Sequence, residues 1–77
     1  MNISELIGRE VLDKSGNNVG KVVDIDVNIS EWSVDYLVVK VGLIKKIPIT
    51  VDKIDKVGDK IILKTAKSEM EKKVGDS

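Results

Sequence analysis

Apolar and polar residues alternate in the middle of the chain with the period of a β-strand. Residues 20–28, GKVVDIDVN, set Val23, Ile25 and Val27 between polar neighbours, which is typical of a half-buried strand. Residues 33–41, SVDYLVVKV, are rich in β-branched and aromatic side chains and predict a second long strand. The NISEW segment turns the chain between them, so we expect a hairpin.

Shorter strands are predicted on both sides of this hairpin. Val11 and Leu12 form an apolar pair before DKSGNNVG, whose Asp, Ser, Gly and Asn indicate a hairpin connection. Residues 46–50, KIPIT, form a strand whose Pro48 cannot donate to a central ladder, so this strand belongs at an edge, an end or a bulge. After the turn KVGDK, residues 60–65 form the last strand. About six short strands with regular turn signals predict an all-β fold, a small antiparallel β-barrel.

The end of the chain has a different pattern. Residues 68–74, SEMEKKV, match a capping box with Ser68 at the cap and Glu71 three residues later. A helix this short is marginal by itself, so we expect a short helical or frayed tail. The chain therefore divides into a barrel domain, residues 1–66, and a C-terminal tail, residues 67–77.

Matching the apolar residues of the two long strands predicts their register. One register sets apolar residues opposite each other along the whole hairpin. It pairs Val27 with Val34, Ile25 with Tyr36 and Val23 with Val38. It places Lys21 across from Lys40, and Asp26 across from Asp35 on the other face. That other face also carries an aliphatic stripe, a candidate interaction surface formed by Val22, Leu37, Val39 and Val41. Another part of the chain, a second copy or another partner should cover this stripe.

Composition limits the chemistry that is available to the chain. Its 77 residues make one domain, and they include no Cys and no His, which excludes disulfides, zinc sites of the usual kind, histidine triads and thiol nucleophiles. No Gly-rich phosphate loop follows a strand. We therefore expect no enzyme activity and no cofactor.

Charge is balanced overall but not along the chain. Thirteen basic residues match thirteen acidic ones, which argues against indiscriminate binding to nucleic acid or anionic membranes. Residues 1–39 carry 3 − 7 = −4, and residues 40–77 carry 10 − 6 = +4. No segment has the ~20 apolar residues of a membrane span, and the N-terminus does not resemble a signal peptide. These features predict a cytoplasmic protein that does not insert into membranes.

Three aspartates, Asp24, Asp26 and Asp35, are the candidate metal ligands. The spacing of Asp24, Asp26 and Asn28 resembles the start of an EF-hand loop, but Ile29 stands where that loop needs Gly, and no helices flank it. Opposed carboxylates of Asp26 and Asp35 could at most form a weak cation site. The single Trp32 and Tyr36 are expected to pack, with Trp32 capping a barrel end. The glycines assigned to structural turns are Gly8, Gly16, Gly20 and Gly58.

The order of motifs resembles the PRC-barrel family, the β-barrel domain shared by the photosynthetic reaction-centre H subunit and the C-terminal half of a ribosome maturation factor. The resemblance spans about residues 4–65 and rests on LIGREVLDKSGNNVGKVVDIDVNI, VDYLVVKVG, IPI and DKVGDKIIL. It implies a small barrel that binds other proteins and assembles larger machines, without a common catalytic centre.

These observations predict a standalone, non-enzymatic protein-interaction and assembly module whose partner is another protein or a second copy in a homodimer. Two alternatives stay open. One is an accessory factor in RNA processing or ribosome maturation that uses the Lys-rich second half, with nucleic-acid contacts that are weak or indirect. The other is weak binding of a divalent cation or small ligand at the acidic hairpin.

Overall fold

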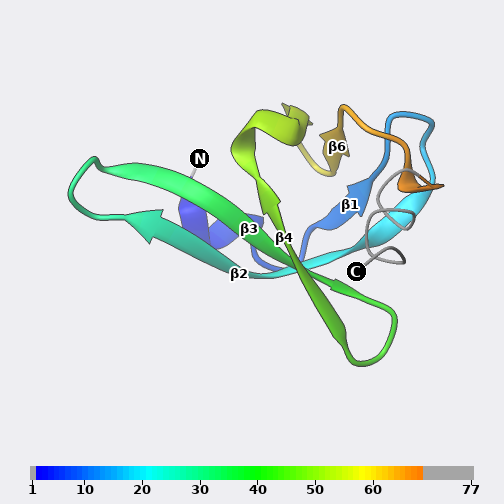
Figure 1. The fold of residues 1–77 in the computed structure, drawn as a ribbon, viewed down its shortest axis with the longest axis horizontal. Helices are drawn as coiled ribbons and strands as arrows, with labels where there is room; N and C mark the ends of the chain where they lie inside the picture. The colour runs from blue at the N-terminus through cyan, green and yellow to red at the C-terminus, as the bar shows by residue number, and fades with distance from the viewer. Residues whose placement is uncertain (1, 69–77) are drawn as a thin grey trace.

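The computed structural model describes residues 2–68, which form strands joined by short turns (Figure 1). The strands are β1 (Glu10–Leu12), β2 (Asn18–Asn28), β3 (Ser33–Val41), β4 (Lys45–Thr50), β5 (Ile54–Val57) and β6 (Ile61–Leu63). The described residues also contain two short 3₁₀ helices, η1 (Ile3–Leu6) and η2 (Val51–Lys53). Of the short helix expected over residues 68–74, all but Ser68 lies outside the described residues.

All six strands belong to one sheet, in the order β4-β3-β2-β1-β6-β5, which curls into a half-barrel. The expectation of a purely antiparallel sheet is wrong at one pair, because β1 and β6 are parallel, with Val11 opposite Ile61. After the edge strand β4, the chain passes through η2 and the hairpin β5–β6 to the far side of β1. It arrives there running in the direction of β1. The position of Pro48 in β4, at the edge of the sheet, confirms the prediction made from its missing N–H.

The long hairpin of β2 and β3 has the predicted partners at both ends and different partners in the middle. Val27 pairs with Val34, and Lys21 pairs with Lys40, as expected. Between these pairs the register shifts twice, between Val22 and Asp24 and between Asp26 and Val27. One extra residue on β2 and one on β3 compensate each other, which is the effect of two β-bulges.

The bulges change which residues face each other and which face the core. Ile25 pairs with Leu37, and Asp26 pairs with Tyr36, so the predicted pairs Ile25–Tyr36 and Asp26–Asp35 are wrong. Val23, predicted to face inward, is 36% exposed.

The aliphatic stripe proposed as an interaction surface lies mostly inside the molecule. Val22, Leu37 and Val39 are 1%, 2% and 0% exposed, and Val41 is half-buried. The first three belong to one core cluster, and Val41 packs against it; the cluster is formed by Val11, Val19, Val22, Leu37, Val39, Ile49, Ile61 and Leu63. The chain itself therefore covers the stripe, and a second copy is not needed to bury it.

The β5–β6 hairpin is attached to the rest of the sheet by more than the short β1–β6 ladder. The Nη1 group of Arg9 donates to the carbonyl oxygen of Gly58 in the β5–β6 turn. The Lys60 ammonium lies 3.1 Å from the Glu10 carboxylate, which forms an exposed ion pair. Such a surface pair adds little stability, so the core contacts of Ile61 and Leu63 hold this hairpin in place.

The four turn glycines have different structural roles. Gly8 and Gly16 have φ angles of 90° and 88°, which other residues adopt only with strain. Gly20 lies within β2 rather than in a turn, and a Cβ atom there would come within 2.1 Å of the carbonyl oxygen of Lys40. Its role is thus to let β2 and β3 approach closely, whereas a Cβ on Gly58 would meet open space.

Replacing Leu37 with Lys should abolish folding, because an unpaired ammonium in the core costs several kcal/mol. The whole free energy of unfolding of so small a domain is only ~5 kcal/mol. The matched control is Val27→Lys on the same hairpin, where the side chain is 45% exposed. Circular dichroism and urea unfolding should give an unfolded Leu37→Lys protein and a folded Val27→Lys protein. A folded Leu37→Lys protein would contradict the inward position of this residue.

Candidate interaction surfaces

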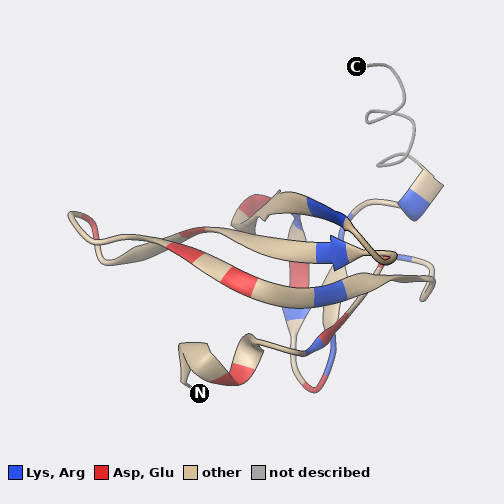
Figure 2. Ribbon diagram, turned by 90° about the horizontal axis from the view of Figure 1, so that it is seen from below, with Lys and Arg blue, Asp and Glu red and all other residues tan. Residues whose placement is uncertain are grey.

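The distal part of the β2–β3 hairpin, residues 24–35, projects from the half-barrel as an acidic arm (Figure 1). Residues 22–39 contain four acidic residues and no Lys or Arg, and the acids are Asp24, Asp26, Glu31 and Asp35. All four side chains are exposed. Acidic positions recur along both strands of the projecting hairpin in Figure 2. The arm therefore presents a surface of one charge to solvent.

Large apolar side chains stand among these acids. Trp32 is 86% exposed, Ile29 is 71% exposed and Val27 is 45% exposed. The expectation that Trp32 caps a barrel end is therefore wrong, because the hairpin carries it away from the barrel. Exposed Trp is uncommon on a surface that has no partner, since aromatic residues concentrate in interfaces.

The backbone of the arm tip holds Trp32 in an unfavourable conformation. Its φ angle is 54°, the one positive value at a non-glycine position in residues 2–68. A left-handed conformation costs a residue with a Cβ atom about 1–2 kcal/mol. The loop is fixed by Asn28, whose Oδ1 atom accepts a hydrogen bond from the Glu31 N–H at 3.1 Å. The tip thus holds Trp32 outward in a defined geometry, although the chain gains no burial from it.

The opposite end of the same strands is basic. Lys21 pairs with Lys40, and Lys40 pairs with Lys46, so three lysines lie side by side across β2, β3 and β4. Figure 2 shows basic positions aligned across three adjacent strands. Like charges opposite each other on a sheet are unfavourable. This lysine row therefore favours an anionic group beside it.

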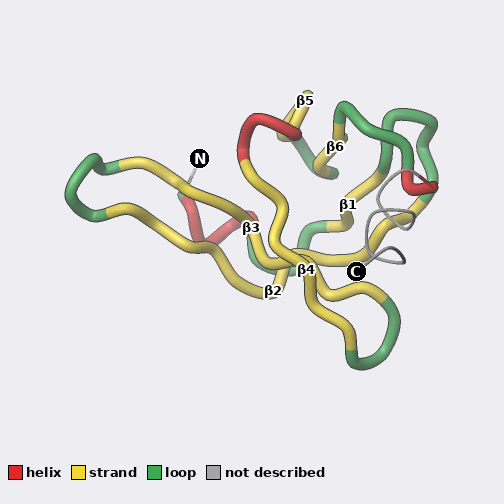
Figure 3. Tube along the Cα trace, in the orientation of Figure 1, coloured by secondary structure: helices red, strands yellow, loops and turns green. Residues whose placement is uncertain are grey.

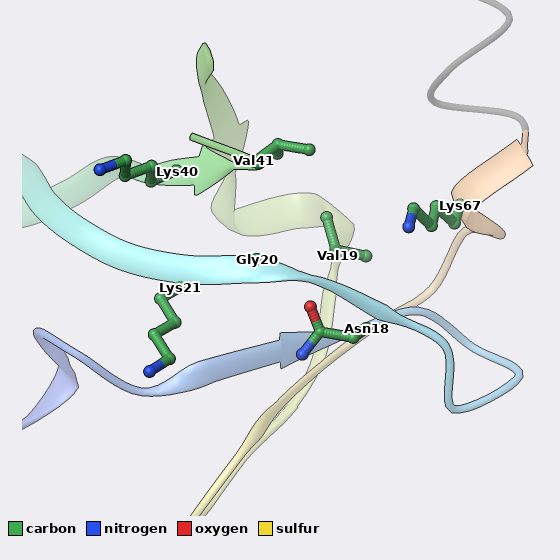
Figure 4. A pocket seen from close by; sticks show the side chains of 8 residues that line it. Asn18, Val19, Gly20, Lys21, Lys40, Val41 and Lys67 are labelled. Atoms are coloured by element: carbon green, nitrogen blue, oxygen red, sulfur yellow. The ribbon is translucent and has the colours of Figure 1, made fainter. Parts of the chain in front are cut away.

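A groove of about 480 Å³ adjoins the lysine row. Its lining combines apolar side chains, bare glycine backbone and cations, from Asn18, Val19, Gly20, Lys21, Lys40, Val41, Gly42 and Lys67. Figure 4 shows Lys67 reaching toward Val19 from the C-terminal segment, while Lys21 and Lys40 stand at the other end. The lining contains no acidic residue. This volume lies within the ~300–1,000 Å³ range of ligand pockets.

The turn between β3 and β4 extends the basic end with an apolar tip. Leu43 and Ile44 are 89% and 94% exposed, and Lys45 and Lys46 follow them. The basic end therefore combines apolar and positive groups, whereas the acidic arm combines apolar and negative groups.

Asp13 positions one wall of the groove. The side chain is 1% exposed, and its Oδ1 atom accepts backbone N–H groups of Ser15 at 2.9 Å and Asn17 at 2.8 Å. Its Oδ2 atom accepts the side-chain amide of Asn17 at 3.2 Å and the backbone N–H of Lys67 at 2.8 Å. These hydrogen bonds, the one from Lys67 foremost, lower the pKa of Asp13 from 3.8 to about 2. Asp13 thus ties the β1–β2 turn to the segment that carries Lys67.

The candidate cation site is not assembled as predicted. Asp26 faces Tyr36 instead of Asp35, because of the bulges. The Oδ1 atom of Asp24 accepts the backbone N–H of its neighbour Ile25 at 2.8 Å. Within residues 2–68, no group of three or more acidic side chains could hold a metal ion together. The same residues contain no helix that is long and apolar enough to cross a membrane.

The six-stranded mixed sheet defines a small β-barrel domain. Its two ends are exposed and oppositely charged, and both carry apolar side chains of the kind found in binding surfaces. The family comparison gives it a more specific place, since the model of the PRC-barrel domain matches residues 1–70. The chain therefore belongs to the PRC-barrel family, as the resemblance indicated. A search of functionally curated proteins finds no match. Family membership supports a protein-interaction module in general.

Sequence reasoning identified the acids of the arm but missed the arm itself, the lysine row and the groove. The signal for the row was present, because the predicted register already set Lys21 against Lys40. The signal for Asp13 was the spacing of Asp13, Ser15 and Asn17, which is typical of a side chain that accepts backbone N–H groups in a turn.

Replacing Trp32 with Asn should stabilise the protein by about 0.5–1 kcal/mol, because Asn tolerates a left-handed backbone and no packing is lost. The control is Ile29→Asn in the same loop, where φ is ordinary and no gain is expected. Urea unfolding measures both changes. A loss of stability as large as that of a buried aromatic residue would show that Trp32 packs against the fold.

Replacing Asp13 with Asn should destabilise the protein at neutral pH, because the NH2 group that takes the place of Oδ2 cannot accept the N–H of Lys67. The folded pKa of Asp13 lies below its unfolded value, so its contribution is complete above pH 3.8 and is lost as pH falls toward about 2. Urea unfolding at a series of pH values should show the difference between wild type and Asp13→Asn shrinking in that window. The exposed Asp55→Asn variant is the control, and an equal shrinkage there would contradict the assignment.

Proposed function

We propose that this PRC-barrel protein is a non-enzymatic interaction module that docks onto a protein partner through its acidic arm. The observation that carries the proposal is Trp32, which is 86% exposed at the tip of a projecting hairpin with a φ angle of 54°. Both features cost stability in the isolated chain. Burial of the indole against a partner would offset the cost, since a fully buried large apolar side chain contributes about 1.5–3 kcal/mol.

The surroundings of Trp32 indicate the chemistry of that partner. Asp24, Asp26, Glu31 and Asp35 surround the apolar side chains of the arm and carry no basic counterpart within residues 22–39. Interfaces combine an apolar centre with a polar rim of complementary charge. The partner surface should therefore hold an apolar pocket that is bordered by Lys or Arg residues.

The positions of the aromatic and basic groups favour a protein partner over RNA. Proteins that bind single strands place aromatic side chains beside basic ones, so that bases stack while phosphates are neutralised. Here the exposed Trp32 lies among acids, and the lysine row lies at the far end of β3. An accessory role in RNA metabolism would have to use the lysine row without an exposed Trp beside it.

A photo-crosslinking amino acid in place of Trp32 tests the proposal in the cells that produce the protein. The expected adducts link position 32 to peptides rich in Lys or Arg, and Asp26→Lys in the same protein should reduce their yield several-fold. The control carries the crosslinker at Val57, which is apolar and 46% exposed on β5. Equal yields at positions 32 and 57, or yields that Asp26→Lys leaves unchanged, would contradict docking through the arm.

A further inference from the structure

We propose that the partner of the acidic arm is the basic end of a second copy of this chain, so that copies associate head to tail. In this arrangement Trp32 of one copy enters the groove between the start of β2 and the end of β3 in the next copy. The inference rests on the proposed function, because it takes the arm as a docking element and adds the identity of what it binds.

The two complementary surfaces cannot meet within one molecule. The arm tip and the β3–β4 turn lie at opposite ends of β3, as the loops at the two ends of the structure show (Figure 3). β3 contains nine residues, which extend about 30 Å at the usual rise of a strand. Trp32 therefore cannot reach the groove of its own chain, whereas the Trp32 of another copy can.

The groove has the properties that an indole ring requires. Val19 and Val41 supply apolar contacts, and Gly42, where a Cβ atom would meet nothing within 4 Å, exposes its backbone, so a planar ring can approach closely. The volume of about 480 Å³ has room for one such side chain. Lys67 extends toward this space (Figure 4), and an ammonium group near the face of Trp attracts its π electrons.

Charge complementarity sets the orientation of the docked arm. Glu31 and Asp35 flank Trp32 in the arm, while Lys21, Lys40 and Lys46 form a row beside the groove. Docking would place acids against a row of lysines that repel one another in the separate chain. The same match opposes alternatives, because two arms side by side or two basic ends side by side would bring like charges together.

The symmetry of this contact is heterologous. Each copy offers one arm and one groove, and the two are occupied by different neighbours, so the contact produces a closed ring or an open chain of copies. A contact of this kind is distinguishable from a two-fold dimer, in which both copies would use the same patch.

Association can be measured by sedimentation velocity over a range of protein concentrations, and by the emission of Trp32, the single Trp of the chain. The wild type should form species larger than two copies as concentration rises, with a blue shift of its emission, and high salt should weaken both effects. Trp32→Ala removes the arm anchor, and Lys40→Glu disrupts the groove end. Each should weaken association by roughly 30-fold or more, as expected for a central contact.

The decisive sample is an equimolar mixture of the Trp32→Ala and Lys40→Glu proteins. The first keeps an intact groove and the second keeps an intact arm, so the mixture should form a complex of two chains and nothing larger. Val57→Ala and Lys56→Glu, exposed changes of the same kind on β5, should associate like the wild type. Circular dichroism verifies that each variant is folded.

Several outcomes would overturn the inference. These are a monomeric wild type at the highest concentration, a mixture of the two variants that stays monomeric, or a two-copy complex that Lys40→Glu leaves intact. RNA bound by a monomeric wild type and lost in Lys40→Glu would instead make the groove a nucleic-acid site. Crosslinks from position 32 to a different protein would keep the proposed function and reject this partner, while the absence of position-specific crosslinks would reject both.

Discussion

The pairing of β2 with β3 is the constraint on which the rest of the structure depends. Two bulges, one on each strand, shift the middle of this hairpin while its ends stay in register. The shift turns Ile25 to the same side as Leu37, toward the core, and it leaves Asp24 and Asp26 on the outer side. A hairpin that was regular throughout would set Asp24 opposite Leu37 on the inner face and would turn Ile25 outward, so the core would lose Ile25 and gain a carboxylate.

The same hairpin separates charge along its length. Its acids gather toward the turn that holds Trp32, and its lysines gather where β2, β3 and β4 meet the groove. Separation of this kind gives the molecule two ends of opposite charge without a net charge, which suits directional association better than non-specific adhesion. Asp13 contributes from the β1–β2 turn by holding Lys67 at the groove through its backbone.

Sequence patterns predicted the strands better than their faces. Alternation located both long strands, and Pro48 marked the edge strand, because those features act within a few residues. The bulges escaped prediction, because Val22 and Val23 are adjacent and both apolar, so alternation alone does not decide which one points inward. The parallel β1–β6 pair depends on the path of the chain through η2, and the exposure of Trp32 depends on how far the hairpin projects. Neither of these has a local signal in the sequence.

Nuclear Overhauser effects between backbone protons across β2 and β3 test the bulged register most directly. The structure predicts contacts of Asp24 with Val38, Ile25 with Leu37 and Asp26 with Tyr36, between regular pairs at both ends. Contacts of Ile25 with Tyr36 and of Asp26 with Asp35 would instead show a regular hairpin. That result would place Asp24 beside Leu37 on the inner face and Ile25 on the outer face, and it would contradict the account of both the core and the acidic arm.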